Sequence, residues 1–298
     1  MGGIRLVGQE EAGQRLLGYH RLLDLHAQNN RATAASWERF ASHRSQVTEL
    51  LRAAGGETVA ILGAGNCNDV DLELLGRQFR EIHLVDIDRA AIERARQWQA
   101  PGLASSLVTH APVDLSGCLE VLPRYRNEVP DLTELAEWSK NAAARAFGAV
   151  TMTFDTVASV CMLSQLMHAC AVGLGVENPC LQVIACATAV AHLRSLVRMV
   201  QPGGTAILIT DVVSSATFPF EERLARGAEP LDLLAQVDKL DATFSGTGPS
   251  FTLEIMSGDV EIAAALEPPR LVTPWVWRFN DETRYFVYAL VAKKKAIP

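Results

Sequence analysis

The sequence predicts an α/β fold built on a mostly parallel sheet, with helices on both of its faces. Three features lead to this prediction. The apolar run 59–62 breaks abruptly into the glycine-rich segment 63–65, and a second apolar run, 82–85, ends at an aspartate. A third apolar run, 205–210, follows a Pro-Gly-Gly turn and also ends at an aspartate. Short apolar runs bounded by turn residues and acids are typical of buried strands in a parallel sheet.

The first run predicts a strand that ends in a tight turn against the start of a helix. Gly63, Ala64 and Gly65 form the turn, and the polar residue Asn66 follows. Glycine accepts backbone angles that other residues avoid, and it lets a ligand approach the main chain closely. Free N–H groups at the start of the helix favour an anionic or electron-rich ligand group.

Asp86 ends the second run, about 20 residues beyond the glycine turn, which is the usual distance for an acid that holds ribose hydroxyls. A carboxylate can accept two hydrogen bonds from a diol. The turn and the acid together therefore indicate a cofactor that contains a nucleoside. A dinucleotide fingerprint would carry a third glycine where this chain has Asn68, which disfavours NAD.

The N-terminal part is expected to form a helix over residues 9–52. One stripe of it carries Trp37, Phe40, Val47 and Leu51 together with one cation, Arg44. Arg44 is either a snorkelling residue at the edge of the stripe or a clamp on a ligand carboxylate, for which its planar fork is suited. His43 lies one position further round and is either a residue of the same cleft or a surface histidine.

The remaining elements follow in order along the chain. We expect helices at 88–99, 131–147 and 180–200, strands at 107–109, 154–162 and 205–210, and an antiparallel hairpin at 274–293. Segments near 116–150 and 214–270 are expected to be insertions beyond the simple core; they either cover a cleft or, for the helix at 131–147, pack on a face of the sheet.

The strand at 154–162 should end at the same edge of the sheet as Gly63 and Asp86, because parallel strands present their carboxyl ends together. Gln165 and His168 follow this strand and are candidates for the substrate cleft. For His168, a satisfied core histidine is the competing interpretation.

Composition excludes some classes of function. The net charge is −7 and 49% of the residues are hydrophobic, which supports a substantial core and disfavours a general nucleic-acid binder. No apolar run is long enough to span a bilayer, and the first residues lack the apolar core of a signal peptide. The 6 cysteines show no metal-site spacing, so we expect reduced core thiols, a cytoplasmic protein, no metal and no membrane partner.

Four segments in order resemble the class I S-adenosylmethionine-dependent methyltransferases. They are LGAGN from Leu62, HLVDID from His83, FDTVASVCMLSQL from Phe154 and VQPGGTAILITD from Val200. The resemblance covers roughly residues 55–215, and the predicted hairpin at 274–293 matches the end of the fold.

The resemblance implies a Rossmann-like seven-stranded sheet with an antiparallel C-terminal hairpin, preceded by a helical cover at 1–54. It implies S-adenosyl-L-methionine as cofactor and S-adenosyl-L-homocysteine as product; the chain size and the insertions favour a small-molecule substrate over nucleic acid. The catalytic candidates are His168 and Gln165, from their place after the strand at 154–162, and His43, from its place on the N-terminal helix. The resemblance places these residues at the cofactor: Gly63, Ala64, Gly65, Asn66, Asp86, Ile87, Asp114, Ser159 and Arg44.

The sequence departs from the family at two positions of the glycine turn. An acid often precedes the first glycine by two residues, where this chain has Ile61, and a frequent third glycine is Cys67. The polar run 66–69 is expected to replace some of the missing contacts. A nicotinamide-dependent oxidoreductase, an aminopropyl transferase like the polyamine synthases, and a non-catalytic cofactor-binding protein are alternatives.

Overall fold

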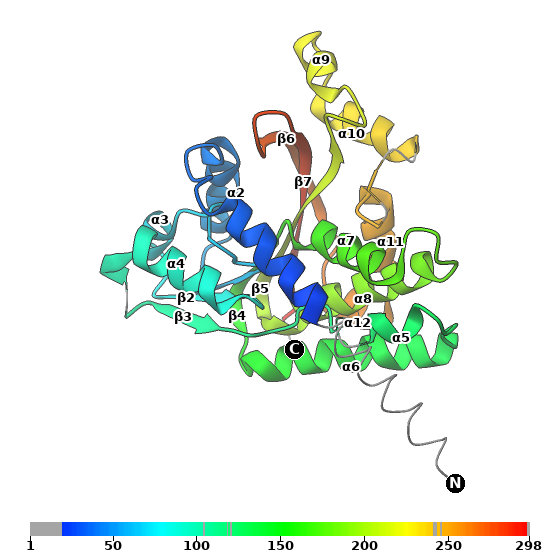
Figure 1. The fold of residues 1–298 in the computed structure, drawn as a ribbon. Helices are drawn as coiled ribbons and strands as arrows, with labels where there is room; N and C mark the ends of the chain where they lie inside the picture. The colour runs from blue at the N-terminus through cyan, green and yellow to red at the C-terminus, as the bar shows by residue number, and fades with distance from the viewer. Residues whose placement is uncertain are drawn as a thin grey trace.

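The computed structural model describes residues 20–103, 105–117, 119, 121–240, 243–244 and 246–296. A seven-stranded sheet in the order β3-β2-β1-β4-β5-β7-β6 forms its centre (Figure 1). In chain order the strands are β1 Thr58–Leu62, β2 Glu81–Val85, β3 Leu107–His110, β4 Phe154–Val160, β5 Val200–Ser214, β6 Arg270–Arg278 and β7 Arg284–Lys293. Strands β1 to β5 pair in parallel, and β7 runs antiparallel to both β5 and β6. The predicted seven-stranded sheet with its closing hairpin is therefore confirmed.

Helices cover both faces of this sheet. They are α2 Ala41–Ala54, α3 Leu72–Gly76, α4 Arg89–Gln99, α5 Leu122–Tyr125, α6 Leu132–Val150, α7 Met162–Leu174, α8 Leu181–Met199, α9 Phe220–Ala225, α10 Pro230–Lys239, α11 Pro249–Gly258 and α12 Val260–Ala265, with a short 3₁₀ helix η1 at Pro101–Leu103. Residues 20–33 form one more helix at the N-terminal end of the described chain.

Alternation along the strands divides the core into two layers, because successive side chains of a strand point to opposite faces. Val59 and Ile61 of β1 pack in one cluster with residues of α2, α3 and α4. Ala60 and Leu62 pack in the other cluster with residues of α6, α7 and α8. Every residue from 59 to 62 is buried, as the continuous apolar run predicts for a parallel strand covered on both faces.

The predicted helix at 9–52 differs from the structure. Its first part, 9–19, lies outside the described residues, and the rest is divided by the turn-containing segment 34–40. Trp37 therefore precedes α2 and does not continue its apolar stripe. The stripe within α2 is buried as expected at Val47 and Leu51.

The fifth strand is longer than the predicted 205–210. Its pairing with β7 runs from Thr205 to Ser214, so Asp211 lies inside the paired part of the strand. A β-bulge interrupts this pairing between Asp211 and Val213. Bulges re-aim side chains and are frequent beside functional sites.

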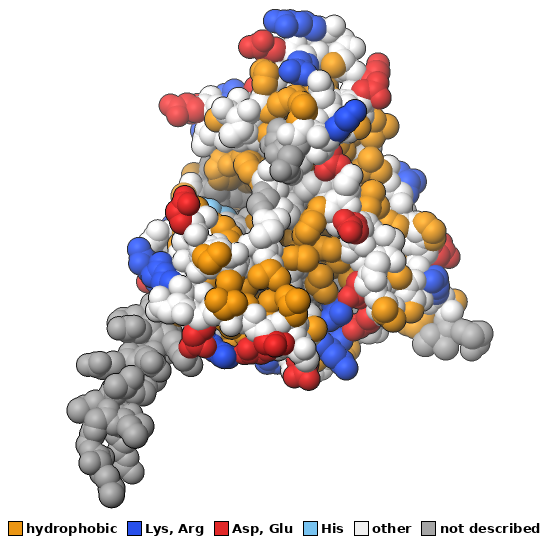
Figure 2. Space-filling model, turned by 90° about the vertical axis from the view of Figure 1, so that its right-hand side faces the viewer, with side chains coloured by type: hydrophobic (Ala, Val, Ile, Leu, Met, Phe, Trp, Pro, Cys, Tyr) orange, Lys and Arg blue, Asp and Glu red, His pale blue; other side chains and the backbone are white. Residues whose placement is uncertain are grey.

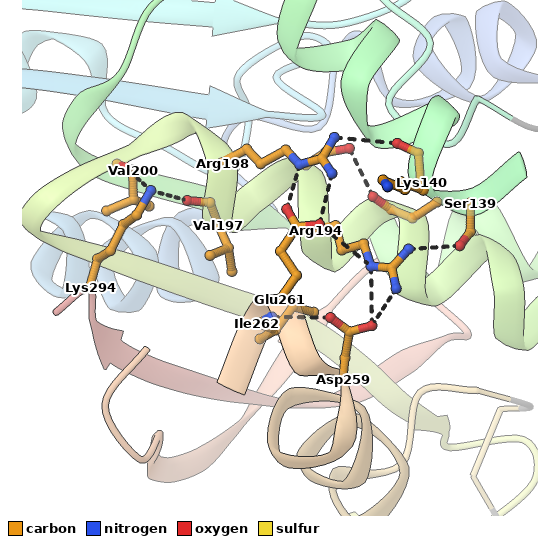
Figure 3. Close-up of polar contacts among 12 residues, drawn as sticks. Ser139, Lys140, Arg194, Val197, Arg198, Val200, Asp259, Glu261, Ile262 and Lys294 are labelled. Atoms are coloured by element: carbon orange, nitrogen blue, oxygen red, sulfur yellow. Dashed lines mark hydrogen bonds and ion pairs between the residues drawn. The ribbon is translucent and has the colours of Figure 1, made fainter. Parts of the chain in front are cut away.

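Ion pairs join the start of α12 to α8, which packs on one face of the sheet (Figure 3). Arg194 donates to Asp259 Oδ2 through Nη2 at 2.6 Å and through Nε at 3.1 Å. Arg198 donates to both oxygens of the Glu261 carboxylate, from Nε to Oε1 at 2.5 Å and from Nη2 to Oε2 at 2.7 Å. Lys294 donates to the carbonyls of Val197 and Val200 at the end of α8.

Arg194→Met should reduce the free energy of unfolding by about 3 kcal/mol, because Asp259 would keep a largely buried charge without its partner. The side chains of this pair are 18% and 9% exposed. Urea denaturation measures the change. The control is Arg226→Met, whose pair with Glu222 is 77% and 69% exposed and should contribute less than about 1 kcal/mol. Equal losses in the two variants would contradict a stabilising role for the α8–α12 contact.

Two features of the structure concern the predictions about nucleic acid and the membrane. On the face drawn in Figure 2, the basic side chains of the described residues are interspersed with acidic ones and form no continuous basic area. Among the described residues, no helix is both long enough and apolar enough to cross a membrane.

Candidate active site

The turn after β1 requires glycine at two positions. Gly63 and Gly65 have φ angles of 76° and 46°, in the left-handed region that side chains disfavour. The N–H groups of Gly63 and Ala64 donate to the carbonyl of Val85, at 2.9 and 3.2 Å. A Cβ atom on Gly65 would lie 2.8 Å from Asn30 Oδ1. The turn is thus tied to the end of β2 and closely covered by the N-terminal helix.

Asp86 supports the turn from the end of β2. Its Oδ2 accepts from the N–H of Gly65 at 2.8 Å, and its Oδ1 accepts from the N–H of Asp88 at 2.8 Å. Burial raises the pKa of Asp86 to about 6, against the lowering effect of these backbone donors. Each carboxylate oxygen has a second lone pair, so Asp86 can brace the turn and still accept a hydrogen bond from a ligand hydroxyl.

The asparagines after the turn hold the N-terminal helix in place. Asn66 Nδ2 donates to the carbonyl of Asn30 at 2.6 Å, and Asn68 Nδ2 donates to the carbonyl of Thr33 at 2.6 Å. Asn30 Nδ2 in turn donates to Asp88 Oδ2 at 3.1 Å. The polar run 66–69 therefore fastens the end of helix 20–33 over the glycine turn.

A cavity of about 510 Å³ opens from this turn along the carboxyl ends of β1, β4 and β5. At the turn end it is lined by residues of the turn and of the N-terminal helix; at the other end it is lined by α7, Asp211 and aromatic side chains. Its lining is Asn29, Asn30, Thr33, Phe40, Gly63, Ala64, Gly65, Asn66, Asn68, Asp69, Cys161, Ser164, Gln165, Met167, His168, Ala171, Asp211, Phe244, Trp277, Phe279 and Tyr285.

Aromatic rings form a continuous wall at the end of the cavity remote from the turn. Trp277 is central, with its ring centroid 5.0 Å from that of Phe40, 5.2 Å from Phe279 and 5.5 Å from Tyr285. Phe244 extends the wall at 6.0 Å from Tyr285. We call these five residues the aromatic wall; most of the contacts are edge-to-face or tilted, as aromatic pairs prefer.

Two carboxylates reach the same cavity. Asp211 lies on β5, and its Oδ1 accepts from Ser164 Oγ of α7 at 2.5 Å. Asp69 lies after the glycine turn, with Oδ1 3.3 Å from His43 Nε2. Burial, and then the nearby charge of Asp69 among smaller causes, raises the pKa of Asp211.

His43 lies behind the aromatic wall and does not line the cavity. Its ring stacks on Trp277 at 4.5 Å, and its Nδ1 accepts from Trp275 Nε1 at 3.0 Å. An indole N–H can only donate, so the proton of neutral His43 is on Nε2, facing Asp69. His43 thus lies next to a cavity carboxylate without lining the cavity itself.

The predicted site residues divide into those at the cavity and those away from it. Gly63, Ala64, Gly65, Asn66, Gln165 and His168 line it, and Asp86 lies directly under the turn. Ile87 packs against the core. Gln165 is half-buried and donates to the carbonyl of Cys161 at 3.1 Å, whereas His168 is exposed at the rim.

Two of the predicted cofactor contacts have other partners in the structure. Asp114 Oδ1 accepts from Ser116 Oγ at 2.6 Å and from the N–H groups of Ser116 and Gly117, as in a turn. Ser159 is buried within β4 and bonds His192 Nε2 at 2.7 Å. Neither lines the cavity.

Arg44 joins the segment before α2 to the loop after the glycine turn. Its guanidinium lies 3.4 Å from the centroid of the Trp37 ring and donates to the carbonyls of Trp37 and Asn68, at 2.6 and 3.2 Å. It does not line the cavity. These contacts favour the packing interpretation of Arg44 over the carboxylate clamp.

Arg44→Lys should lower the free energy of unfolding by about 1–2 kcal/mol, because lysine cannot reproduce the flat stacking on Trp37 and would have to donate to the two carbonyls from a different position. Thermal unfolding measures the loss, and titration calorimetry with S-adenosylmethionine measures cofactor affinity. We expect little change in affinity. Weakened cofactor binding at an unchanged melting temperature would instead support the hypothesis that Arg44 binds the carboxylate of the cofactor.

Sequence reasoning missed several lining residues. Asp69 and Asp211 each follow a strand-like apolar run and could have been included on that signal. Asn30, Phe40, Phe279 and Tyr285 carry no local signal, because each reaches the cavity from an element distant in the sequence.

The strand order decides the class of the fold. The cavity lies where the order turns from β2-β1 to β4-β5, and β7 is inserted antiparallel between β5 and β6. A glycine turn follows β1, and a buried acid ends β2. The chain has the class I methyltransferase fold. In such open sheets, ligands bind at the switch point outside the carboxyl ends of the strands.

Comparison with known proteins gives only distant similarity. No protein-family model matches the chain, and no curated protein matches it in sequence. Among solved structures, a SAM-dependent methyltransferase from Anabaena variabilis aligns with 12% identity over 92% of this chain and 95% of that one, with a TM-score of 0.48. At these values the class I methyltransferase assignment rests on the strand order.

Two further structures align in the same way. The magnesium protoporphyrin IX methyltransferase of Synechocystis, solved with bound SAH, shares 12% identity over 86% of this chain and 84% of its own, with a TM-score of 0.42. An O-methyltransferase family protein from Burkholderia thailandensis shares 14% identity over 91% of this chain and 59% of its own, with a TM-score of 0.44.

Proposed function

We propose that this protein transfers a methyl group from S-adenosyl-L-methionine to a small-molecule acceptor. The observation that carries the proposal is one cavity of about 510 Å³ that joins the braced glycine turn to the aromatic wall. A site of this size is typical for small molecules. It offers a cofactor end and an acceptor end side by side, as direct transfer requires.

The residues at the turn fit the cofactor. Gly63 and Gly65 leave the main chain open to close approach, and Asp86 presents a carboxylate at the end of β2 for the ribose hydroxyls. Asp69, which lines the cavity beyond the turn, is placed for the positively charged amino-acid part. The cofactor supplies an activated methyl group, so the protein mainly has to hold the acceptor in line with it.

The described residues before position 55 act in this proposal as a cover. Helix 20–33 is fastened to the turn through Asn66 and Asn68 and contributes Asn29, Asn30 and Thr33 to the cavity lining. Gln165 and His168 are the acceptor-side candidates on α7. A general base is needed only when the attacking atom carries a proton at neutral pH.

The alternatives differ in what binds at the turn. An oxidoreductase would bind NAD, an aminopropyl transferase would prefer decarboxylated S-adenosylmethionine, and a non-catalytic protein would bind cofactor without turnover. The antiparallel β7 and the residue Asn68 in place of a third glycine both favour methyl transfer over NAD chemistry.

Isothermal titration of the purified chain with four ligands tests the proposal. We expect binding of S-adenosylmethionine and S-adenosylhomocysteine, weaker binding of decarboxylated S-adenosylmethionine, and none of NAD. Binding of NAD alone would contradict methyl transfer and favour an oxidoreductase. Preferential binding of decarboxylated S-adenosylmethionine would favour an aminopropyl transferase. Incubation of the loaded protein with an acceptor library, followed by mass spectrometry for a gain of one methylene unit, separates an enzyme from a binding protein.

A further inference from the structure

The described residues that line the cavity include acidic side chains but no lysine or arginine. The acidic side chains are the carboxylates of Asp69 and Asp211. Asp211 is only 6% exposed, and burying a carboxylate without a compensating charge is costly. A ligand that brings positive charge to Asp211 would relieve this cost.

The position of Asp211 assigns it to the acceptor end. Asp86 on β2 fixes the nucleoside end of the cavity, and the strand order places β5 on the opposite side of β1 and β4. In the antiparallel pairing of β5 with β7, Asp211 lies opposite Val287, which is two residues from Tyr285. Asp211 therefore lies on the side of β1 and β4 away from Asp86, and we place the acceptor there. Asp69, by contrast, lies in the loop directly after the turn.

The aromatic wall supplies the second feature. Trp277 and Tyr285 line the cavity with Asp211, and Trp277 is held from behind by the stacked ring of His43. The faces of Trp, Tyr and Phe rings carry negative potential and attract organic cations. A neutral apolar acceptor would use the rings but would leave the buried charge of Asp211 without a cation, since its hydrogen bond from Ser164 comes from a neutral hydroxyl.

We propose that the methyl acceptor is an amine, which binds as an ammonium ion between Asp211 and the aromatic wall. This inference rests on the proposed methyl transfer and names its substrate class. Primary and secondary amines with an apolar or aromatic body fit it, because the wall receives the body and the carboxylate receives the charged nitrogen.

The same carboxylate can accept the proton that the ammonium must lose before it reacts. Asp211 takes one N–H proton, and the freed nitrogen lone pair forms the new N–C bond. The C–S bond of the cofactor breaks with its electron pair staying on sulfur, which leaves the neutral thioether. The methylated nitrogen carries one positive charge, and the proton on Asp211 passes to solvent.

The surroundings of Asp211 suit a group that both binds a cation and accepts a proton. Ser164 orients it through a bond to Oδ1, and burial raises its pKa toward the range in which proton transfer is efficient. The titratable groups that face it come from α2, the loop after β1, the end of β4 and β7; they are His43, Asp69, Cys161, Tyr285 and Tyr288.

Matched pairs of ligands test the inference by binding alone. The full chain is saturated with S-adenosylhomocysteine and titrated at pH 7.5 with phenethylamine, tryptamine and benzylamine, and with the alcohols of the same carbon skeletons. We expect at least one amine to bind roughly tenfold or more tightly than its alcohol, the scale of a hydrogen bond to a charged group. If no amine is preferred over its alcohol, the inference is overturned.

The variant Asp211→Asn tests whether the preference for amines depends on Asp211. It keeps the shape and an acceptor for Ser164, so we expect an unchanged or higher melting temperature, normal binding of S-adenosylhomocysteine and loss of the amine preference. With any amine that is methylated, the rate of the variant should rise only toward higher pH, where the amine is already neutral. The control is Asp232→Asn, an exposed carboxylate of α10, which should behave as the wild type.

The two proposals can fail separately. Absence of S-adenosylmethionine binding contradicts the methyl transfer, whatever the amines do. Normal cofactor binding with an amine preference that survives in Asp211→Asn, or that disappears in Asp69→Asn instead, contradicts the role of Asp211 alone.

Discussion

Gly65→Val should weaken binding of S-adenosylmethionine by about 100-fold or more while the sheet stays folded. At φ 46° a β-branched residue is strained, which costs about 1–3 kcal/mol. Its first carbon would also meet Asn30 Oδ1 at 2.8 Å, so the cover and the turn must move apart. The N–H of Gly65 that donates to Asp86 would move with them. Calorimetric titration measures the loss of affinity.

Gly148→Val is the matched control for this substitution. Gly148 lies in α6, and a Cβ atom there would have no neighbour within 4 Å. We expect normal cofactor affinity in this variant and circular dichroism like that of the wild type in both. If Gly65→Val binds the cofactor as tightly as Gly148→Val does, the cofactor does not lie against the turn after β1.

Asp86→Asn should weaken cofactor binding by about 2 kcal/mol, or roughly 30-fold, the scale of hydrogen bonds to a charged acceptor. The amide keeps an oxygen for the N–H of Gly65 but loses the charge that strengthens the ribose contacts. Calorimetry at pH 7.5 measures the change. Unchanged cofactor affinity in the folded variant would show that Asp86 does not contribute to cofactor binding.

The titration of Asp86 adds a pH dependence with a defined sign. Its pKa is raised from 3.8 to about 6, so the carboxylate is lost as pH falls through 6, and wild-type affinity should fall with it. The contribution of Asp86 to folding stability runs the other way: it is fully present below its ordinary pKa and is lost as pH rises through about 6. Asp86→Asn should therefore remove both dependences, and a pH-independent wild-type affinity between 5 and 8 would contradict this assignment.

Much of the fold could be predicted because the strands carry strong local signals. The run 59–62 is apolar throughout and buried throughout, and β6 and β7 form the hairpin predicted at 274–293, with its turn at residues 280–283. Helix α4 begins where predicted, with Asp88 as N-cap accepting from the N–H of Ala91 at 3.2 Å. Such signals act within a few residues and do not depend on the rest of the molecule.

The break at 34–40 could not be predicted in the same way. It contains no glycine or proline, and Trp37 falls on the same stripe as Phe40 and Arg44. The chain turns there because Trp37 packs under the Arg44 guanidinium and Arg44 donates to two carbonyls. Tertiary contacts of this kind override local helix preference.

The site was partly predictable for a related reason. Spacing along the chain predicts that Gly65 and Asp86 meet, because strand order and the parallel arrangement fix where both strands end. The aromatic wall joins Phe40 to Trp277 and Tyr285 across more than half of the chain, and no short pattern encodes such a contact. His43 illustrates the limit: its place on the helix follows from the sequence, but only the structure shows that it is buried, that its Nδ1 accepts from Trp275 and that its Nε2 lies 3.3 Å from Asp69.

The most direct measurement is a crystal structure of the chain with S-adenosylhomocysteine. The account predicts the ribose hydroxyls within hydrogen-bonding distance of Asp86, the backbone of Gly63–Gly65 against the cofactor, and the sulfur directed toward Asp211 and the aromatic wall. A cofactor bound elsewhere, or one whose sulfur points away from Asp211 toward β3, would contradict it.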